Sequence, residues 1–269
     1  MIQKVLVPPE RGQRYYSLHY RFFIEAMRAA GIKVETGAVL HDYDVSFEAR
    51  IDGRPVTIDF SDHFHAETLG LDMPIFKFHY SRARHGEIEN VFPLSPISFH
   101  EWYSVPEIEY QPAKSRRILN AQRPGGAATE RRAAVQAKLR KAFGDDLDTE
   151  ITDQAGFWAR AGECAVAVCV PGARLDILDR GQLQLMALGV CTISTRLDIT
   201  LPFGNEIEAG WEYVECRPDF SDLIEKVEWC RSNPVACERT GQNAAETFDR
   251  ACRPARLAHW IEQCLEVTR

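Results

Sequence analysis

Residues 165–194, AVAVCVPGARLDILDRGQLQLMALGVCTIS, constrain the fold of this chain more than any other stretch. The apolar run Ala165–Val170 has the length and β-branching of a strand that is buried on both faces. A polar loop follows, and apolar residues then recur at helical spacing over 183–187. Gly189 stands where a helix C-cap favours glycine, and Val190–Ser194 has the pattern of another strand. The stretch therefore predicts a βαβ unit.

A βαβ unit closes with a right-handed crossover, which fixes where its loops lie. The loop before the helix, which holds Asp176 and Asp179, falls at the carboxyl edge of a parallel sheet. Open α/β sheets bind their ligands at that edge. We therefore expect this loop to belong to a binding site.

The rest of the second half repeats the alternation of strands and helices. Strands are predicted at 116–121, 148–152 and 213–216, and helices at 129–143, 157–162, 219–230, 234–251 and 254–267. This order predicts a doubly wound domain over 116–269, with its last helices packing back toward the first domain.

The first half begins with a strand at 4–7, a helix at 16–30 that stops at Gly31, and a strand at 32–35. Alternating apolar residues on both sides of Asp52-Gly53 then predict a β-hairpin. Two prolines and weak periodicity make 105–115 a linker, so the first domain covers 1–110. The fold class expected is α/β with two Rossmann-like domains, the first small and carrying the hairpin.

Composition limits the kind of partner and compartment. The net charge of −7 disfavours nucleic acid as a partner. No apolar run approaches the roughly 20 residues of a membrane helix, and the start is too polar for a signal peptide, so a cytoplasmic location is expected. The eight cysteines form no CxxC pair and have no repeating interval, which favours buried free thiols over disulfides.

Two Rossmann-like halves joined by a linker resemble the glycosyltransferase-B architecture, and three segments carry the resemblance. LQLMALGVCTIS at 183–194 is similar to the E-A-M-A-x-G-x-P-V-I segment of donor-binding domains. Residues 213–224 resemble a strand, loop and helix behind the donor site. Residues 227–248 resemble the final helices of the capsule-associated and protein O-glucosyltransferase-like group. The resemblance covers about 116–267 and implies a nucleotide-diphosphate sugar, with a UDP-sugar as our guess, and neither a metal ion nor another cofactor.

A departing diphosphate needs positive charge and amide donors. For this role we select Arg123, with Gly125 and Gly126 allowing close backbone approach, and Arg180 together with the amides that open its helix. The alternative for the segment RPGG is a plain turn with a solvated arginine.

A nucleotide also needs a polar side chain for its ribose. Asp179 and Gln184 are the candidates, and Gln184 matches a position where the family commonly has a glutamate. As alternatives, Arg180 forms a surface salt bridge with Asp176 or Asp179, and Gln184 is a plain helix-surface residue.

The acceptor hydroxyl needs a general base, and the histidine-rich first half offers one. We nominate Asp62 and His63, which follow the hairpin. Asp59, Ser61, His63 and His65 share one strand face if the strand continues. A metal site built from Asp59, His63 and His65 is one alternative, and a solvated strand end is the other.

Four more residues are expected on the acceptor side. Arg11 and Arg14 lie in the loop after the first strand, at the ligand edge of the first domain, where they suit an acidic or phosphorylated acceptor. His79 and Arg82 face the expected cleft, although a structural role explains them as well. The acceptor itself is a glycan, a small molecule or a protein.

The sequence thus favours a metal-independent, hexosyltransferase-like glycosyltransferase that moves a sugar from a nucleotide-diphosphate donor to a hydroxyl. The alternative from another class is a non-catalytic nucleotide- or carbohydrate-binding protein that keeps the fold. A nucleic-acid-modifying transferase is a third possibility and requires a basic cleft in a chain of net charge −7.

Overall fold

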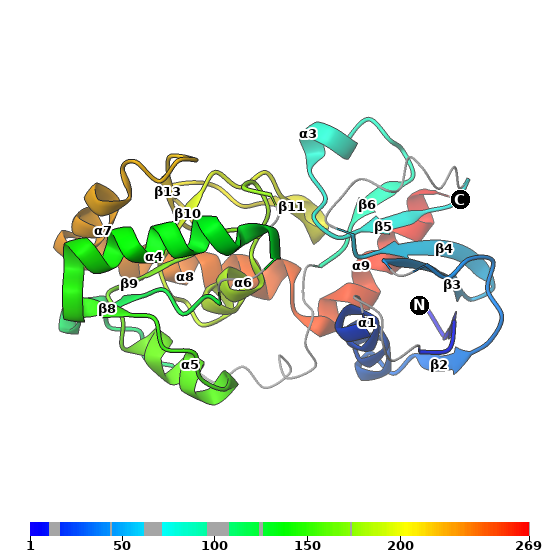
Figure 1. Ribbon diagram of the computed structural model, residues 1–269. Coiled ribbons are helices and arrows are strands. Elements are labelled where there is room, and N and C mark those ends of the chain that lie inside the picture. The colour runs from blue at the N-terminus through cyan, green and yellow to red at the C-terminus, as the bar shows by residue number, and fades with distance from the viewer. Residues whose placement is uncertain are drawn as a thin grey trace. The chain divides into compact units, whose positions relative to one another are not determined.

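The computed structural model describes residues 1–10, 17–43, 45–61, 72–95, 108–123, 126–172 and 174–268 (Figure 1). Contacts divide the chain into two compact units, and neither is continuous in sequence. The first unit comprises Met1–Ser104, Ile199–Glu206 and Arg250–Arg269, and the second comprises Val105–Asp198 and Ile207–Asp249.

A six-stranded mixed sheet forms the centre of the first unit, in the order β2-β1-β3-β4-β5-β6. Its strands are β1 (Lys4–Val7), β2 (Lys33–Thr36), β3 (Ser46–Ile51), β4 (Arg54–Asp59), β5 (Ile75–Lys77) and β6 (Val91–Pro93). β1 is parallel to β2 and antiparallel to β3, whereas β4, β5 and β6 run parallel to one another.

The predicted hairpin is confirmed. β3 and β4 pair antiparallel, with Ile51 opposite Arg54, so that two residues form the loop. Asp52 and Gly53 have φ angles of 49° and 86°. A two-residue hairpin loop of this type needs positive φ at both positions, which is why an Asp-Gly pair forms it.

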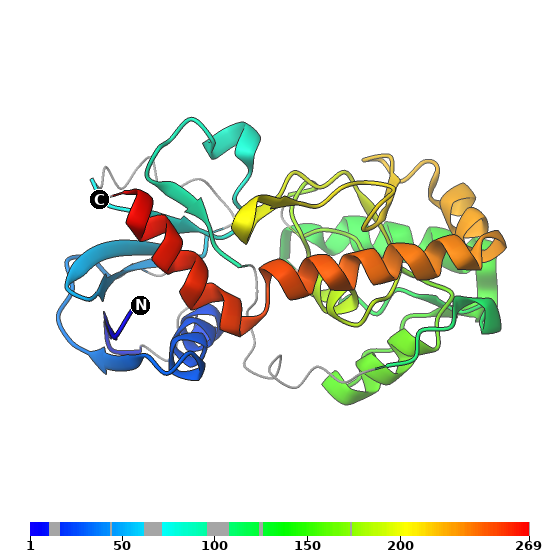
Figure 2. The same ribbon diagram turned by 180° about the vertical axis from the view of Figure 1, so that it is seen from behind.

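Among the described residues, the helices of the first unit are α1 (Ser17–Ala29), the short α3 (Arg82–His85) and α9 (Pro254–Val267). α9 packs against α1, although more than 200 residues of chain lie between them (Figure 2). Gly31 follows α1 with φ 77°, as its predicted stop position requires. A small ribbon of β11 (Thr200–Leu201), η5 (Pro202–Gly204) and β12 (Asn205–Glu206), absent from the sequence prediction, also belongs here.

The second unit contains a five-stranded parallel sheet in the order β13-β10-β9-β7-β8. Its strands are β7 (Ile118–Leu119), β8 (Leu147–Asp148), β9 (Val166–Val168), β10 (Thr192–Thr195) and β13 (Val214–Cys216). Its helices are α4 (Thr129–Phe143), α5 (Gln154–Gly162), α6 (Arg180–Ala187), α7 (Leu223–Ser232) and most of α8 (Pro234–Ala251). The predicted α/β class is confirmed.

Both faces of this parallel sheet are buried, as the apolar run around β9 predicts. Val166 and Val168 pack with side chains from α4 and α7, while Ala167 and Cys169 pack with side chains from α5 and α6. Alternate residues of β9 therefore pack into the hydrophobic cores on opposite faces of the sheet. This is the layering of a doubly wound domain.

The strand order creates a switch point in the sheet. The chain leaves β7 to form β8 on one side of it and then returns to form β9 on the other side. The connections after β7 and β9 therefore diverge, which opens a crevice at the carboxyl ends of these two strands. Ligands of open α/β sheets bind at such a crevice.

One further expectation concerns the cysteines. All eight cysteines are buried and carry free thiols, as the sequence predicts. Within the ranges that the structure describes, none of the helices combines the length and the apolar character needed to cross a membrane.

Candidate functional site

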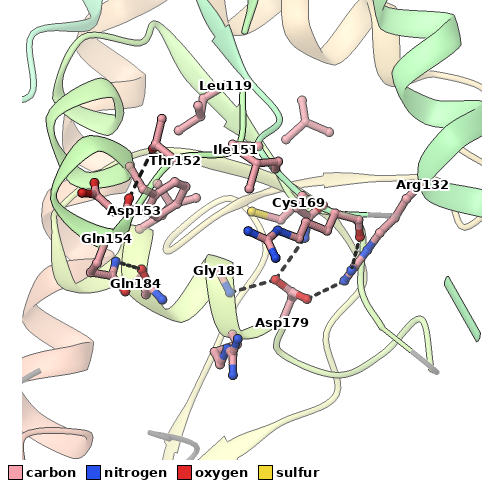
Figure 3. Close-up of a pocket in the computed structure, with 17 residues that line it drawn as sticks. Leu119, Arg132, Ile151, Thr152, Asp153, Gln154, Cys169, Asp179, Gly181 and Gln184 are labelled. Carbon is pink, nitrogen blue, oxygen red and sulfur yellow. Dashed lines mark hydrogen bonds and ion pairs between the residues drawn. The ribbon is translucent and has the colours of Figure 1, made fainter. Parts of the chain in front are cut away.

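A cavity of about 310 Å³ lies at the switch point of the second unit (Figure 3). Its walls come from the ends of β7 and β9, from α4, and from the segments that open α5 and α6. The polar lining includes Gln122, Arg123, Arg132, Asp153, Gln154, Asp179, Arg180 and Gln184. Asp179, in the loop predicted to belong to a binding site, therefore lines a cavity.

Asp179 is the best-connected side chain of the cavity. As N-cap of α6, it accepts a hydrogen bond from the backbone N–H of Gly181 at 2.8 Å. Gln122 Nε2 donates to the same carboxylate at 3.0 Å, and Arg132 Nη2 donates to its second oxygen at 2.8 Å. Figure 3 shows Arg132 and Asp179 pointing toward one another. With 15% and 14% of their side chains exposed, the two residues form a largely buried ion pair.

A second helix begins at the same cavity. Asp153 caps α5 by accepting a hydrogen bond from the N–H of Gly156 at 2.8 Å. Gln154, the first residue of α5, donates through Nε2 to Gln184 Oε1 and so joins the start of α5 to the middle of α6 (Figure 3). Each helix N-terminus carries a partial positive charge. Two such ends at one cavity favour an anionic ligand.

The charged side chains favour the same kind of ligand. Arg123, Arg132 and Arg180 line the cavity with Asp153 and Asp179, so three positive charges face two negative ones. Both aspartates already accept hydrogen bonds as helix caps. The cavity therefore has a net charge of +1 from its lining side chains, before the helix ends are considered.

Cys169 also lines the cavity, but its thiol is not a nucleophile at neutral pH. Burial raises the pKa of this thiol well above its ordinary value, and the nearby carboxylate of Asp179 raises it further. Because the thiolate is the reactive form, the protonated thiol acts as a small apolar group here.

The structure brings most of the predicted donor residues together. Arg123, Asp179, Arg180 and Gln184 all line the cavity, whereas Gly126 opens η3 (Gly126–Ala128) with φ 56° and is not among the lining residues. Gly125 lies outside the described residues.

The structure also bears on the alternative roles of Gln184 and Arg180. Gln184 is 7% exposed, so it is not a helix-surface residue. Asp179 forms an ion pair with Arg132, and Asp176 forms one with Arg174 at 2.8 Å, while the salt bridge of Arg180 stays a prediction.

The residues predicted for catalysis and acceptor binding belong to the first unit. Asp62, His63, Arg11 and Arg14 lie outside the described residues and stay predictions, as does His65 in the alternative metal site. Asp59, the third member of that alternative site, is buried beside Lys77, with 3.6 Å between Oδ2 and Nζ.

Two predicted acceptor-side residues are described. His79 is buried and has a φ of 51°, which places it in the left-handed region. Arg82 opens α3, is exposed, and forms an ion pair with Glu206 at 2.9 Å. Neither residue belongs to the cavity of the second unit.

Gln122, Arg132, Asp153 and Gln154 line the cavity but are absent from the sequence prediction. Asp153 did have a signal, since an aspartate before a helical stretch is a preferred N-cap. The predicted helix starts at 157, whereas α5 begins at Gln154, so the prediction does not place Asp153 at the cap position. Arg132 lies one turn into α4, and only the folded chain places it beside Asp179.

The capping networks predict different costs for two matched substitutions. We expect Asp153→Ala to lower the free energy of unfolding by about 1 kcal/mol, the usual value for an N-cap. We expect Asp179→Ala to cost about 2–3 kcal/mol, because it also leaves the largely buried Arg132 without its carboxylate. Urea unfolding followed by circular dichroism measures both, and equal losses would show that the ion pair adds nothing.

Comparisons of the sequence and the structure with known proteins find only weak or short similarities. No family model matches the chain. A stretch of 36 residues, 13% of the chain, is 44% identical to the uncharacterized protein 035R of Invertebrate iridescent virus 3 and spans 3% of that protein. Sucrose-phosphate synthase from Thermosynechococcus elongatus superposes with a TM-score of 0.41 and 15% identity, over 76% of this chain and 48% of that one. The chain thus spans about half the length of that structure, and neither likeness places it in a family.

Proposed function

We propose that this protein is a glycosyltransferase whose second unit binds the nucleoside diphosphate of a nucleotide-sugar donor in the cavity at the switch point. One observation carries the proposal. Two helix N-termini and three arginine side chains converge at the crevice between the carboxyl ends of β7 and β9. A diphosphate matches such a site because it brings two or three negative charges and accepts several hydrogen bonds.

The lining residues suggest separate roles in donor binding. Arg123 and Arg180 bind the diphosphate. Asp179 is occupied by three hydrogen-bond donors, so it holds Arg132 and Gln122 in place rather than binding ribose. Gln184 is the better ribose partner, since an amide both donates and accepts hydrogen bonds. The apolar side chains of Leu119, Ile151 and Phe157 supply the wall against which the base packs.

In the transfer reaction the bond between the sugar and the diphosphate breaks as the acceptor hydroxyl forms a new bond to the sugar. Negative charge then develops on the departing diphosphate, and the arginine side chains stabilise it because they are already in place. These cations replace the metal ion that other transferases use, so transfer is metal-independent. The acceptor hydroxyl loses its proton to Asp62 or His63.

Thermal unfolding in the presence of nucleotides tests donor binding. A ligand of the folded state stabilises it by about 2.7 kcal/mol at a concentration of 100 times its Kd, so UDP and UDP-glucose should raise the melting temperature. Arg180→Ala should abolish the shift. Arg174→Ala is the matched control, since Arg174 pairs with Asp176 in the preceding loop and does not line the cavity.

Other outcomes separate the alternatives. If no nucleoside diphosphate raises the melting temperature, donor binding in this cavity is wrong. If UDP-glucose binds and is neither hydrolysed nor transferred to any glycan, small-molecule or protein acceptor, the chain is a non-catalytic binding protein. If the rise in melting temperature is kept in Arg180→Ala and lost in Arg132→Ala, the diphosphate binds closer to α4 than proposed.

A further inference from the structure

Three buried cysteines of the second unit lie together. The Sγ atoms of Cys191, Cys230 and Cys237 are all within 4.8 Å of one another. Their exposed fractions are 0%, 1% and 0%. They come from three elements: Cys191 immediately precedes β10, Cys230 lies near the end of α7, and Cys237 lies in the first turns of α8. We call them the three-thiol cluster.

Close backbone packing holds the cluster together. A Cβ at Gly241 would lie 1.9 Å from the carbonyl oxygen of Gly189 and 3.2 Å from the backbone nitrogen of Cys191. α8 therefore contacts the turn before β10 directly, and Cys237, one helical turn before Gly241, lies on the same face. The Cys237 thiol donates to the carbonyl oxygen of Cys230 at 3.4 Å, which joins the first turns of α8 to the end of α7 (Figures 1 and 2).

The cluster is separate from the cavity described above. It lies at the amino end of β10, whereas the cavity opens at the carboxyl ends of β7 and β9, and none of the three thiols lines that cavity. Among the described residues, no further cysteine, histidine, aspartate or glutamate joins the group. The surrounding core is apolar and includes Ile193 and Val227.

Coordination number and charge select the kind of ion that such a site accepts. Structural zinc takes four protein ligands, and the described residues offer three. A divalent ion on three thiolates has a net charge of −1, and copper(I) on three thiolates has −2. Burying either charge in an apolar core is costly. A trivalent ion on three thiolates is neutral and needs no fourth ligand, because its lone pair occupies the remaining position.

We propose that Cys191, Cys230 and Cys237 form a three-sulfur binding site for a trivalent thiophilic ion of the arsenic(III) class. Arsenite enters as As(OH)₃. Three As–S bonds replace three As–O bonds, and the three thiol protons leave with the hydroxide groups as three waters. Arsenic stays in the +3 state, so the reaction needs neither an oxidant nor a reductant. The bound ion covalently joins the residue before β10 to α7 and α8.

Burial determines how the ion enters. Because the three thiols are closed to solvent, arsenite reaches them only during local opening of the α7–α8 region, and binding is slow. The bound ion stabilises the folded unit, so saturated protein has a higher melting temperature than the free protein. Refolding in the presence of arsenite supplies a second route to the same complex.

Native mass spectrometry of the full chain, kept reduced with a phosphine, tests the proposal. The expected product has one arsenic per chain and a mass increase equal to one arsenic minus three hydrogens, the signature of three As–S bonds. Cys191→Ser, Cys230→Ser and Cys237→Ser should each lose this product. Cys164→Ser is the matched control, since Cys164 is buried in the same unit outside the cluster and should leave the product unchanged.

Several results would overturn the site. One is that no arsenic adduct forms, either after long incubation with arsenite or after refolding in its presence. Another is an adduct in which arsenic keeps a hydroxyl group, and a third is an adduct that still forms in all three cluster variants. Stoichiometric binding of zinc or copper(I) without arsenic binding would also overturn the trivalent assignment. X-ray absorption at the arsenic edge uses the unmodified protein, so this test does not depend on how the variants fold. The site requires three sulfur neighbours around arsenic, and any oxygen neighbour would contradict it.

Discussion

Replacing Gly241 by alanine is expected to lower the free energy of unfolding of the second unit by about 3 kcal/mol or more, because the new methyl group has no space. Its Cβ would lie 1.9 Å from the carbonyl oxygen and 2.7 Å from the carbonyl carbon of Gly189. Backbone atoms cannot move away by changing rotamer, as a side chain does. α8 must therefore shift away from the turn before β10.

Differential scanning calorimetry measures this loss. For a unit of this size, about 3 kcal/mol corresponds to a fall in melting temperature of roughly 6–12 °C. Gly162→Ala is the matched control, because Gly162 also lies in a helix but a Cβ there would meet its nearest neighbour at 3.6 Å, an ordinary contact. Alanine normally favours a helix over glycine, so the control should be neutral or slightly stabilising. Similar melting temperatures for the two variants would contradict the close packing of α8.

Local backbone rules explain which parts of the fold are predictable from sequence. The hairpin depends on positive φ at Asp52 and Gly53, and α1 stops where Gly31 adopts φ 77°. Both signals lie within a few residues of the structure that they determine. The small ribbon at 200–206 has no such signal, since its two strands have two residues each.

Packing between distant segments is harder to predict. The periodicity of the sequence predicts α9 as a helix with an apolar face. It does not predict which element packs against that face, and in the structure this element is α1. The domain boundary between residues 110 and 116 stays a prediction. A single boundary is difficult to predict here because each compact unit contains separate segments of the chain. The chain passes through the first unit three times.

The candidate site shows the same contrast. The βαβ pattern leads directly to Asp179, Arg180 and Gln184, because they lie at the cap and within the helix that follows one strand. Arg132 and Gln122 come from other elements and meet Asp179 only in the folded unit.

The three-thiol cluster depends equally on tertiary packing. Cysteine spacing correctly indicates buried free thiols. It cannot indicate that three of them converge, because Cys191 and Cys230 are 39 positions apart and meet only through the packing of α7 and α8 beside β10.

A buried ion pair in the first unit gives the second large expected effect. Lys77, at the end of β5, has 1% of its side chain exposed, and Asp59, at the end of β4, has none. Lys77 Nζ lies 3.6 Å from Asp59 Oδ2 and donates to Ser61 Oγ at 3.1 Å and to the carbonyl of Ser61. Asp59 Oδ1 accepts from the N–H and the hydroxyl of Ser61 at 2.8 and 2.6 Å. The lysine therefore neutralises a carboxylate that has no access to water.

Lys77→Met keeps the unbranched chain as far as the ε position and removes the charged ammonium group, and we expect it to lower the free energy of unfolding by about 3–5 kcal/mol. Most of this cost comes from the buried carboxylate left without a cation, not from the net value of the pair. The double variant Lys77→Met/Asp59→Asn should therefore be more stable than Lys77→Met alone, because the amide is neutral and still accepts the hydrogen bonds of Ser61. Urea unfolding of the two single variants and the double variant gives the coupling energy. Strictly additive losses would mean that Lys77 stabilises the unit through Ser61 and not through Asp59.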